Sequence, residues 1–478
     1  MAQSSINNIK PGSHIHLMGI CGTAMASLAG LLKDRGFKIS GSDLNPYPPM
    51  STQIENLGIS ISRPYKKENL HPVPDFVVVG NVISASNEEA QEMVKLNLPF
   101  CSLPQAMGEV IIGNRNSNVI AGTHGKTTTT SLMAWVMETC GLKPGFLIGG
   151  IPKNFSLSFR DPLANTFVIE GDEYDTAYFD KVPKFIHYKP KNVILTSVEF
   201  DHADIYKDFD AVKSAFFRLM KLIPEEGSLV YWGDDKNVGE IAFSCACKNK
   251  FSYGFNESAD YRSQIVSEEE NTEFQVYFKD KLIANFVTPL TGRFNILNAT
   301  AVVGQAHLQE LDMNLVAQAL SSFQGVKRRQ EILGEFNGVL LIEDFAHHPT
   351  AVKETVKAIQ NKYAKRRVFS VFEPRSATSR RKIFQKDYVE AFSQAQEVLI
   401  AKAIDQGKIS ESDRFSVEEL IEDLRAKNKS AKVFDSADQI VADLGERTRA
   451  GDVILIMSNG GFDGIYQKLI NRLSAREL

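Results

Sequence analysis

A glycine-rich stretch in the first third of the chain has residue types suited to holding phosphate. It reads Gly122-Thr123-His124-Gly125-Lys126-Thr127-Thr128. Glycines let backbone N–H groups approach phosphate oxygens, a lysine offsets their charge, and an adjacent hydroxyl can hold Mg²⁺. The loop is shorter than the usual G-x4-G-K-[ST] pattern, which would need a glycine at Ile120. Its place between a predicted strand, Val119 to Ala121, and a helix favours phosphate binding over a chance glycine turn.

Two acidic clusters follow predicted strands farther along the chain. Glu170-Gly171-Asp172-Glu173-Tyr174-Asp175 comes after the strand 166–169, and Asp201-His202-Ala203-Asp204 comes after the strand 193–196. Either cluster alone is more typical of a solvated loop. The carboxyl ends of parallel strands meet at one edge of a sheet, where the phosphate loop would also lie. Because carboxylates are ligands that Mg²⁺ prefers, the three motifs together predict a metal site.

Gly19, Gly22 and Asp43 form a third pattern, near the N-terminus. An apolar run from His14 to Met18 leads into the glycines, and a helix is predicted from Ala24 to Arg35. This is part of a dinucleotide fingerprint, which would suit a nicotinamide-dependent oxidoreductase. The third glycine of G-x-G-x-x-G is missing, so the redox interpretation is weak.

These motifs require several α/β units to position them. The chain has 478 residues, 43% of them hydrophobic, which predicts about three domains. Strands alternate with helical patterns, as in parallel sheets, and turn-rich residues 113–118 separate the first two units. We place the domains at 1–112, 113–325 and 326–478. The first contains predicted strands at 59–61 and 76–79, the second one at 228–232, and the third strands around 339–342, 368–371, 397–400 and 453–457.

Charge, hydropathy and cysteine usage exclude several function classes. The 54 Lys+Arg nearly balance the 58 Asp+Glu, so no nucleic-acid footprint or electrostatic membrane anchor is expected. No apolar run approaches the ~18 residues of a membrane span, and no signal peptide is evident. Five scattered cysteines argue against a disulfide framework, and Cys245-x-Cys247 lacks a second pair at zinc spacing. A cytoplasmic protein with ordinary buried thiols is predicted.

In order along the chain, these motifs resemble those of the Mur ligase family. The further matching stretches are Gly19 to Met25, Glu199 to Asp204, Phe294 to Ala299, Asp344 to Thr350, Phe372 to Ser376 and Ser458 to Gly464. The resemblance covers essentially the whole chain. It implies a three-domain α/β architecture: a Rossmann-like UDP-sugar-binding domain, a P-loop ATPase-like central domain, and a Rossmann-like C-terminal domain for the amine substrate.

The resemblance implies an ATP-dependent, amide-forming ligase of peptidoglycan recycling that works through an acyl phosphate. UDP-N-acetylmuramate would be the carboxylate donor and L-alanyl-γ-D-glutamyl-meso-diaminopimelate the amine, with ADP and phosphate released. The nearest alternative adds L-alanine to the same donor in de novo synthesis. A rival from another class is a non-catalytic P-loop switch protein. Neither nucleic acid nor membrane is an implied partner, and a monomer or weak oligomer is expected.

The resemblance also assigns roles to individual residues. The implied ATP site consists of Gly122, Thr123, His124, Gly125, Lys126, Thr127, Thr128, Asn295, Asn298, Arg329 and Asp344. The implied UDP-sugar site consists of Gly19, Cys21, Gly22 and Asp43, and the implied peptide site of Arg375, Ser376 and Asn459. The implied Mg²⁺ ligands are Thr127, Glu170 and His202, and the implied catalytic residues are Lys126, His202 and His348.

Alternatives stay open at three of these positions. Arg328 fits almost as well as Arg329, and the two arginines could also be a solvated pair. Asn298 could cap a helix, and the His347–His348 pair ahead of Pro349 could equally be a helix-capping pair. Several Mur ligases carry a carbamylated lysine where this chain has Phe217, and its absence is typical of the alanine-adding branch.

Overall fold

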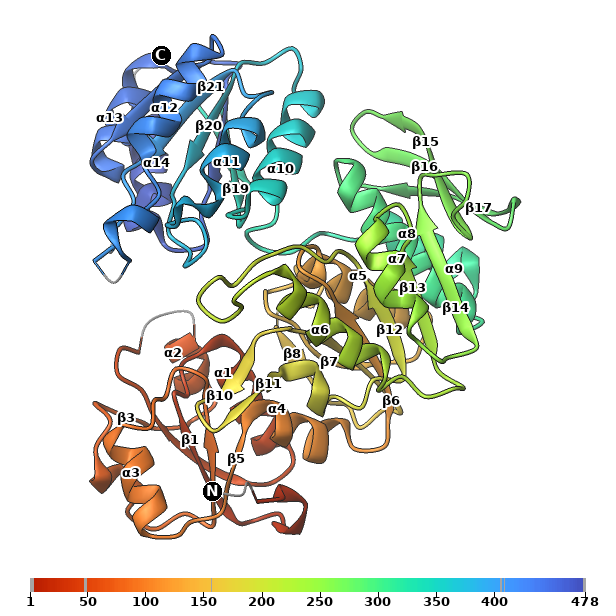
Figure 1. The fold of residues 1–478 in the computed structure, drawn as a ribbon, viewed down its shortest axis with the longest axis vertical. Coiled ribbons are helices and arrows are strands. Elements are labelled where there is room, and N and C mark those ends of the chain that lie inside the picture. Colours follow the sequence, from red (N-terminus) through yellow and green to blue (C-terminus); the bar gives the residue numbers. More distant parts are fainter. Residues whose placement is uncertain (1–3, 47–49, 156, 405, 408, 476–478) are drawn as a thin grey trace.

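The structure is a computed structural model that describes residues 4–46, 50–155, 157–404, 406–407 and 409–475. The chain folds into three α/β units, each built on its own main sheet (Figure 1). The five cysteines are free, four of them buried and Cys140 half-buried, as the sequence predicts. Among the helices in the described ranges, none has the length and apolar character needed to cross a membrane.

The N-terminal unit has a five-stranded parallel sheet in the order β3-β2-β1-β4-β5. The order reverses between β1 and β4, which is where such sheets bind ligands. The predicted first helix is confirmed to within one residue at each end, while the strand predicted at 59–61 begins only at Ile61. Its elements are β1 (His14–Met18), α1 (Thr23–Asp34), β2 (Lys38–Ser42), α2 (Met50–Asn56), β3 (Ile61–Ser62), β4 (Phe76–Val79), α3 (Glu88–Lys95), β5 (Phe100–Ser102) and α4 (Leu103–Ala106), with short helices η1 (Ile6–Asn8), η2 (Lys67–Leu70) and η3 (Met107–Ile112).

The central unit is built on a ten-stranded sheet, β17-β16-β15-β14-β13-β12-β6-β9-β7-β8. Its middle strands are parallel, whereas β15, β16 and β17 form antiparallel hairpins that the sequence did not predict. Its strands are β6 (Asn116–Ala121), β7 (Gly145–Leu147), β8 (Phe159–Arg160), β9 (Thr166–Gly171), β12 (Asn192–Leu195), β13 (Ser228–Trp232), β14 (Asn249–Gly254), β15 (Tyr261–Glu268), β16 (Thr272–Phe278) and β17 (Lys281–Thr288), with a separate hairpin of β10 (Asp175–Ala177) and β11 (Asp180–Pro183). Its helices are α5 (Lys126–Thr139), η4 (Lys184–His187), α6 (Phe209–Met220), α7 (Lys236–Phe243), α8 (Arg293–Leu308) and α9 (Met313–Ser321).

The C-terminal unit has a six-stranded sheet, β18-β19-β23-β20-β21-β22, which is parallel except for β18. Alternate residues of β19 face two different apolar clusters, one on each side of the sheet, so helices cover both faces. Its elements are β18 (Glu331–Phe336), β19 (Val339–Asp344), α10 (Pro349–Lys362), β20 (Val368–Phe372), η5 (Lys382–Phe384), α11 (Gln385–Ala391), β21 (Glu397–Ala401), η6 (Glu411–Asp413), α12 (Val417–Ala426), β22 (Ser430–Phe434), α13 (Ala437–Arg447), β23 (Val453–Met457), η7 (Phe462–Gly464) and α14 (Ile465–Ser474).

The three units are joined in different ways. One apolar cluster runs continuously from the N-terminal unit into the central unit and contains Leu28 of α1 together with Phe159 of β8. Asp161 adds ion pairs to Arg35 and Arg115, both 2.7 Å long. The two clusters of the C-terminal unit contain residues of that unit alone. The three sheets lie within 14–102, 116–288 and 331–457, and the exact domain boundaries stay predictions.

Candidate functional site

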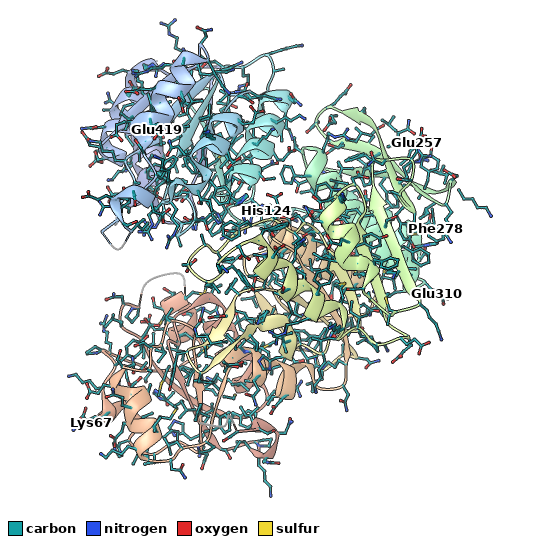
Figure 2. The ribbon with its side chains drawn as sticks, in the orientation of Figure 1. Lys67, His124, Glu257, Phe278, Glu310 and Glu419 are labelled. Carbon is teal, nitrogen blue, oxygen red and sulfur yellow. The ribbon has the colours of Figure 1, made fainter. Side chains whose placement is uncertain are left out.

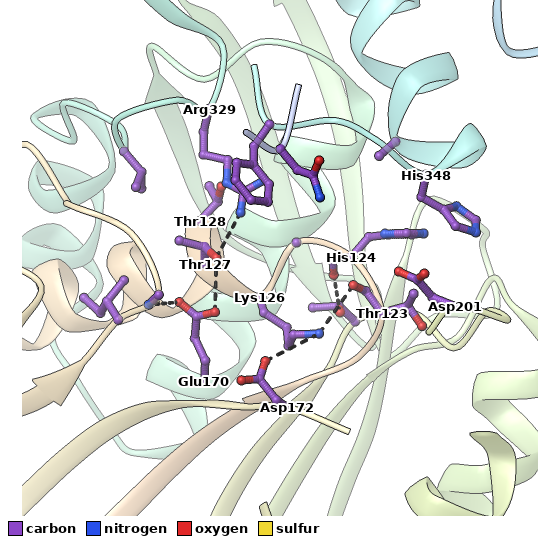
Figure 3. A pocket seen from close by; sticks show the side chains of 18 of the residues that line it. Thr123, His124, Lys126, Thr127, Thr128, Glu170, Asp172, Asp201, Arg329 and His348 are labelled. Carbon is purple, nitrogen blue, oxygen red and sulfur yellow. Dashed lines mark hydrogen bonds and ion pairs between the residues drawn. The ribbon is translucent and has the colours of Figure 1, made fainter. Parts of the chain in front are cut away.

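A cavity of ≈ 1060 Å³ lies where the three units meet. It is lined by the ends of β9 and β19, by the loops that follow β1, β6 and β12, and by the first turns of α1 and α5; several of these side chains are drawn in Figure 3. All the residues assigned above line it, except Gly122, Arg375 and Ser376. Residues far apart in sequence therefore converge on one space.

The phosphate loop bends sharply between β6 and α5. Gly125 has φ +82° and caps α5, and Gly122 has φ +129°, a conformation that side chains rarely allow. Lys126 begins α5, and its Nζ donates to the carbonyl of Gly122 at 2.6 Å and to Glu173 Oε2 at 2.9 Å. Burial alone would lower the pKa of Lys126, but Glu173 and Asp172 hold it well above its usual value. The ammonium is therefore charged and fixed inside the loop.

Thr127 and Glu170 offer oxygen atoms beside that ammonium. The Thr127 hydroxyl donates to Glu170 Oε2 at 3.1 Å, and the Gly149 backbone N–H donates to Oε1 at 2.5 Å. Burial raises the pKa of Glu170. An enclosed carboxylate next to a hydroxyl suits Mg²⁺, which prefers oxygen ligands.

His202 has different neighbours from the other two predicted metal ligands. Its Nε2 lies 3.7 Å from Glu173 Oε1, and its ring centroid is 4.8 Å from that of Tyr174. Phe217, where some family members have a modified lysine, is half-buried against the apolar cluster. The Mg²⁺ and catalytic assignments of His202 stay predictions.

The two adjacent arginines point in different directions. Arg329 Nη2 donates to the Thr127 hydroxyl at 3.3 Å, and its guanidinium lies 4.5 Å from the centroid of Phe345 (Figure 3). Arg328 binds Glu343 at 2.6 Å and the backbone carbonyls of Ser458 and Gly460. The two are therefore not a solvated pair, and Arg329 is the one that faces the phosphate loop.

Asn295, Asn298 and Asp344 are all buried at the cavity wall. Asn298 lies in the second turn of α8, whose cap is Gly292, so the helix-capping alternative for Asn298 is wrong. Asp344 ends β19 and accepts hydrogen bonds from the backbone N–H groups of Gln330 and Ala346, at 2.8 and 2.7 Å. It thereby fixes the turn that carries Arg329.

His348 is the cap of α10, one of the two roles open from the sequence. Its Nδ1 accepts from the Thr350 backbone N–H at 3.3 Å, and its Nε2 lies 3.1 Å from the carbonyl oxygen of Phe200. Burial lowers its pKa to about 4, so it is neutral at physiological pH. A catalytic role for His348 stays a prediction.

The proposed UDP-sugar residues gather at the turn between β1 and α1. Asp43 Oδ2 accepts from the Cys21 backbone N–H at 2.9 Å, Gly19 has φ +79°, and Gly22 caps α1. Burial raises the pKa of the Cys21 thiol to about 11, so it stays protonated. The loop after β4, around Asn81, also lines this end of the cavity and was missed from the sequence.

The proposed peptide residues lie on the neighbouring loops that follow β20 and β23. Arg375 packs against Gly460, with its Nη1 3.4 Å from Glu373 Oε1, and 43% of its side chain is exposed. Ser376 donates to the Ser379 hydroxyl at 2.9 Å. Asn459 lines the cavity, and its Oδ1 is buried without a hydrogen-bond partner in the described part of the chain.

Sequence reasoning assigned no role to Glu173 or Glu199. Both belong to the motifs quoted above, so their presence in acidic clusters was the available signal. Glu173 pairs with Lys126, and Glu199 Oε2 accepts from the Thr350 hydroxyl at 2.6 Å. Burial alone would raise the pKa of Glu199, but His124, His348 and Thr350 lower it to about 2.

Family models match along most of the chain. Residues 14–115 match "Mur ligase family, catalytic domain", residues 120–306 match "Mur ligase middle domain", and residues 328–460 match "Mur ligase, glutamate ligase domain". The chain is 36% identical over 465 residues to the UDP-N-acetylmuramate–L-alanyl-γ-D-glutamyl-meso-2,6-diaminoheptandioate ligase of Escherichia coli K12. This alignment covers 97% of this chain and 98% of the relative. It is 32% identical over 465 residues to a UDP-N-acetylmuramate–L-alanine ligase of Clostridium kluyveri, in an alignment that covers 96% of this chain and 98% of the relative.

Solved structures agree with this relationship. A murein peptide ligase from Psychrobacter arcticus superposes with a TM-score of 0.73 at 34% identity, covering 98% of this chain and all of that one. A UDP-N-acetylmuramate–alanine ligase from Thermotoga maritima gives a TM-score of 0.79 at 20% identity, covering 96% and 99%, which supports the fold alone. The matched models, the full-length relatives and the three-unit α/β architecture agree: the chain belongs to the Mur ligase family.

Proposed function

We propose that this protein is an ATP-dependent ligase that joins UDP-N-acetylmuramate to L-alanyl-γ-D-glutamyl-meso-diaminopimelate. The observation that carries the proposal is the 36% identity, over 97% of the chain, to a relative named for this pair of substrates. A second such relative, from Haemophilus influenzae, is also 36% identical over 97% of the chain. The reaction belongs to peptidoglycan recycling in the cytoplasm.

The geometry of the cavity supports a reaction with three substrates. The β1–α1 turn at one end suits the UDP-sugar, the phosphate loop suits ATP, and the loops after β19 and β23 bring the C-terminal unit to the same space. Holding three reactants in line supplies much of the rate acceleration in such a reaction. Enclosing the reactants in one cavity also keeps water from the acyl phosphate.

Side chains of this protein have to offset charge on the transferring phosphoryl group. The lactyl carboxylate attacks the γ-phosphorus of ATP, which gives an acyl phosphate and ADP, and the peptide amine then attacks the carbonyl and displaces phosphate. Lys126 and Arg329 are the cations placed beside Thr127 in the phosphate loop. Mg²⁺ held by Thr127 and Glu170 would neutralise further phosphate charge.

The decisive experiment measures ADP release with ATP, Mg²⁺ and UDP-N-acetylmuramate, with the tripeptide or L-alanine as the amine. We expect turnover that depends on the tripeptide and is absent with L-alanine. Turnover with L-alanine instead would assign the protein to the activity named for the Clostridium kluyveri relative. ATP binding without release coupled to either amine would refute the ligase assignment.

A further inference from the structure

Three metal-ligating side chains meet where the central and C-terminal units touch. His124 comes from the phosphate loop, Glu199 from the loop after β12, and His348 from the start of α10. Figure 2 places His124 at this junction, and Figure 3 shows His124 and His348 close together. Glu199 Oε2 lies 3.5 Å from His124 Nε2 and 3.7 Å from His348 Nδ1, and one ligand atom of each residue falls within 4.8 Å of the others.

These distances suit a small cation. Zinc bound by imidazole nitrogen and carboxylate oxygen has bonds of about 2.0–2.2 Å, so two ligands of a tetrahedral site lie about 3.4 Å apart. The two distances to Glu199 are already close to that value. Two histidines and one glutamate, with a fourth position open, are also the protein ligands of several zinc enzymes.

The hydrogen-bonding state of the histidines favours metal binding. His124 Nε2 is buried, and within the described chain it has no hydrogen-bond partner. His348 Nε2 lies 3.1 Å from the Phe200 carbonyl, so it carries the proton and donates, which leaves the lone pair of Nδ1 facing Glu199. Metal-binding histidines commonly donate their other ring N–H to a backbone carbonyl in this way. A bound ion would have to displace only the long 3.3 Å hydrogen bond from the Thr350 backbone N–H.

The Glu199 carboxylate is oriented to bind the same ion. The Thr350 hydroxyl donates to its Oε2 at 2.6 Å, which orients the carboxylate between the two rings. The carboxylate therefore brings a negative charge to the point where the two histidine nitrogens converge.

We propose that His124, Glu199 and His348 bind a divalent transition-metal ion of the Zn²⁺ class. Such an ion differs from the Mg²⁺ expected at Thr127 and Glu170, because two imidazoles favour zinc-like metals whereas Mg²⁺ prefers oxygen ligands. The ion takes ligands from both units, so it fastens the C-terminal unit to the central unit. Zn²⁺ should consequently slow turnover, since product release requires the units to separate.

Cobalt binding tests the site without relying on the ligase reaction. The nucleotide-free, full-length protein is titrated with Co²⁺, whose tetrahedral complexes absorb strongly in the visible range, and Zn²⁺ is then added. We expect one equivalent of Co²⁺ to give a tetrahedral spectrum that Zn²⁺ abolishes. Glu199→Gln and His348→Gln should each lower the Co²⁺ affinity by at least about tenfold. His71→Gln, which removes an exposed imidazole far along the chain from the site, should retain it.

A further variant tests where the ion binds. His202→Gln removes the nearby imidazole that contacts Glu173 and should leave the cobalt spectrum unchanged. The proposal fails if wild-type protein gives no tetrahedral spectrum, if the spectrum survives Glu199→Gln and His348→Gln, or if His202→Gln abolishes it. Because a buried histidine can matter for folding, thermal unfolding is measured in parallel without metal, and His124→Gln replaces any variant that does not fold. Zn²⁺ should raise the unfolding midpoint of wild-type protein and not that of Glu199→Gln.

Discussion

The Lys126 ammonium is enclosed between the phosphate loop and the segment that follows β9. Its side chain is 11% exposed, and that of its partner Glu173 is 2% exposed. Removing one member of a buried ion pair leaves the other charge uncompensated, which costs about 3–5 kcal/mol. Lys126 therefore has a structural role as well as its proposed role in phosphate binding.

A double variant separates these two roles. We expect Lys126→Met to abolish measurable ADP release and to lower the free energy of unfolding by about 3 kcal/mol, because Glu173 is left unpaired. Adding Glu173→Gln should restore most of the stability and none of the turnover. Denaturant unfolding and the ADP-release assay measure the two effects. An equally stable Lys126→Met protein would show that the ion pair contributes little.

Arg328 and Arg329 form a matched pair for mutation. Arg329→Gln should raise the KM for ATP by about 10- to 100-fold, the effect of losing one charged hydrogen bond, with little loss of stability. Arg328→Gln should instead lower the free energy of unfolding by about 2 kcal/mol, because Glu343 and two carbonyls lose their donor. Kinetics and denaturant unfolding of both proteins test this, and the reverse pattern would contradict the geometry.

Arg375 is exposed enough to bind an incoming ligand. We expect Arg375→Ala to raise the KM for the tripeptide about tenfold or more while the KM for ATP stays unchanged, because a guanidinium can bind a peptide carboxylate with two hydrogen bonds. Arg375→Lys keeps the charge and loses this geometry, so its KM should be intermediate. An unchanged KM in Arg375→Ala would remove the residue from the peptide site.

The bend of the phosphate loop between β6 and α5 depends on the backbone conformation of Gly122, whose φ is +129°. A Cβ added at Gly122 would lie 2.2 Å from the Thr196 hydroxyl and 2.8 Å from the Ser197 backbone N. Gly122→Ala should therefore displace the loop and abolish ATP binding, measured by calorimetry. Gly451→Ala is the control, because Gly451 has φ +96° and nothing within 4 Å of an added Cβ. That variant should cost about 1–2 kcal/mol in stability and leave ATP binding intact.

Buried parallel strands were the elements best predicted from sequence. Phe76–Val79, Ser228–Trp232 and Val453–Met457 have the predicted bounds, because strands covered on both faces read as continuous apolar runs. Strand β6 was predicted too short, since its first residues are polar. Ser117 and Asn118 are nevertheless buried: Ser117 donates to the Lys189 carbonyl and Asn118 accepts from Gln309, partners far along the chain that local pattern cannot reveal.

In the candidate site too, the sequence predicted the features that are local and missed those that depend on contacts between distant residues. Motif spacing identified the phosphate loop and the acidic clusters, because each is contiguous in sequence. It could not pair Lys126 with Glu173 or Glu199 with Thr350. It also could not choose between Arg328 and Arg329, since their directions depend on Glu343 and Phe345 of the folded C-terminal unit.

At the scale of the whole molecule, the two interdomain contacts differ in chemistry. The N-terminal and central units share a continuous apolar cluster. The C-terminal unit meets the loop after β12 through three hydrogen bonds, Thr350 to Glu199 and Thr378 to Asp201, both at 2.6 Å, and His348 to Phe200, and through a ring contact between Phe384 and Phe200 with centroids 6.3 Å apart. Such hydrogen bonds exchange readily with water. The C-terminal unit is therefore the one expected to separate during the catalytic cycle.

Removing both threonine hydroxyls tests this. The Thr350→Val/Thr378→Val protein should have a larger radius of gyration in small-angle X-ray scattering, because Glu199 and Asp201 would recover hydrogen bonds by exposure to water. Thr139→Val serves as the control, since its hydroxyl binds the backbone of its own helix. An unchanged radius of gyration would mean that other contacts hold the C-terminal unit in place.

The cavity is continuous across all three units, with Gly19 of the N-terminal unit and Asn459 of the C-terminal unit both in its wall. Two ligands that occupy separate parts of one space can be tethered, and the second then binds at an effective concentration in the millimolar range when a short flexible linker spans the sites. A uridine nucleotide linked covalently to an adenosine nucleotide should thus bind far more tightly than either nucleotide alone. The same open path that brings three substrates together makes the enzyme vulnerable to one molecule that is long enough to follow it.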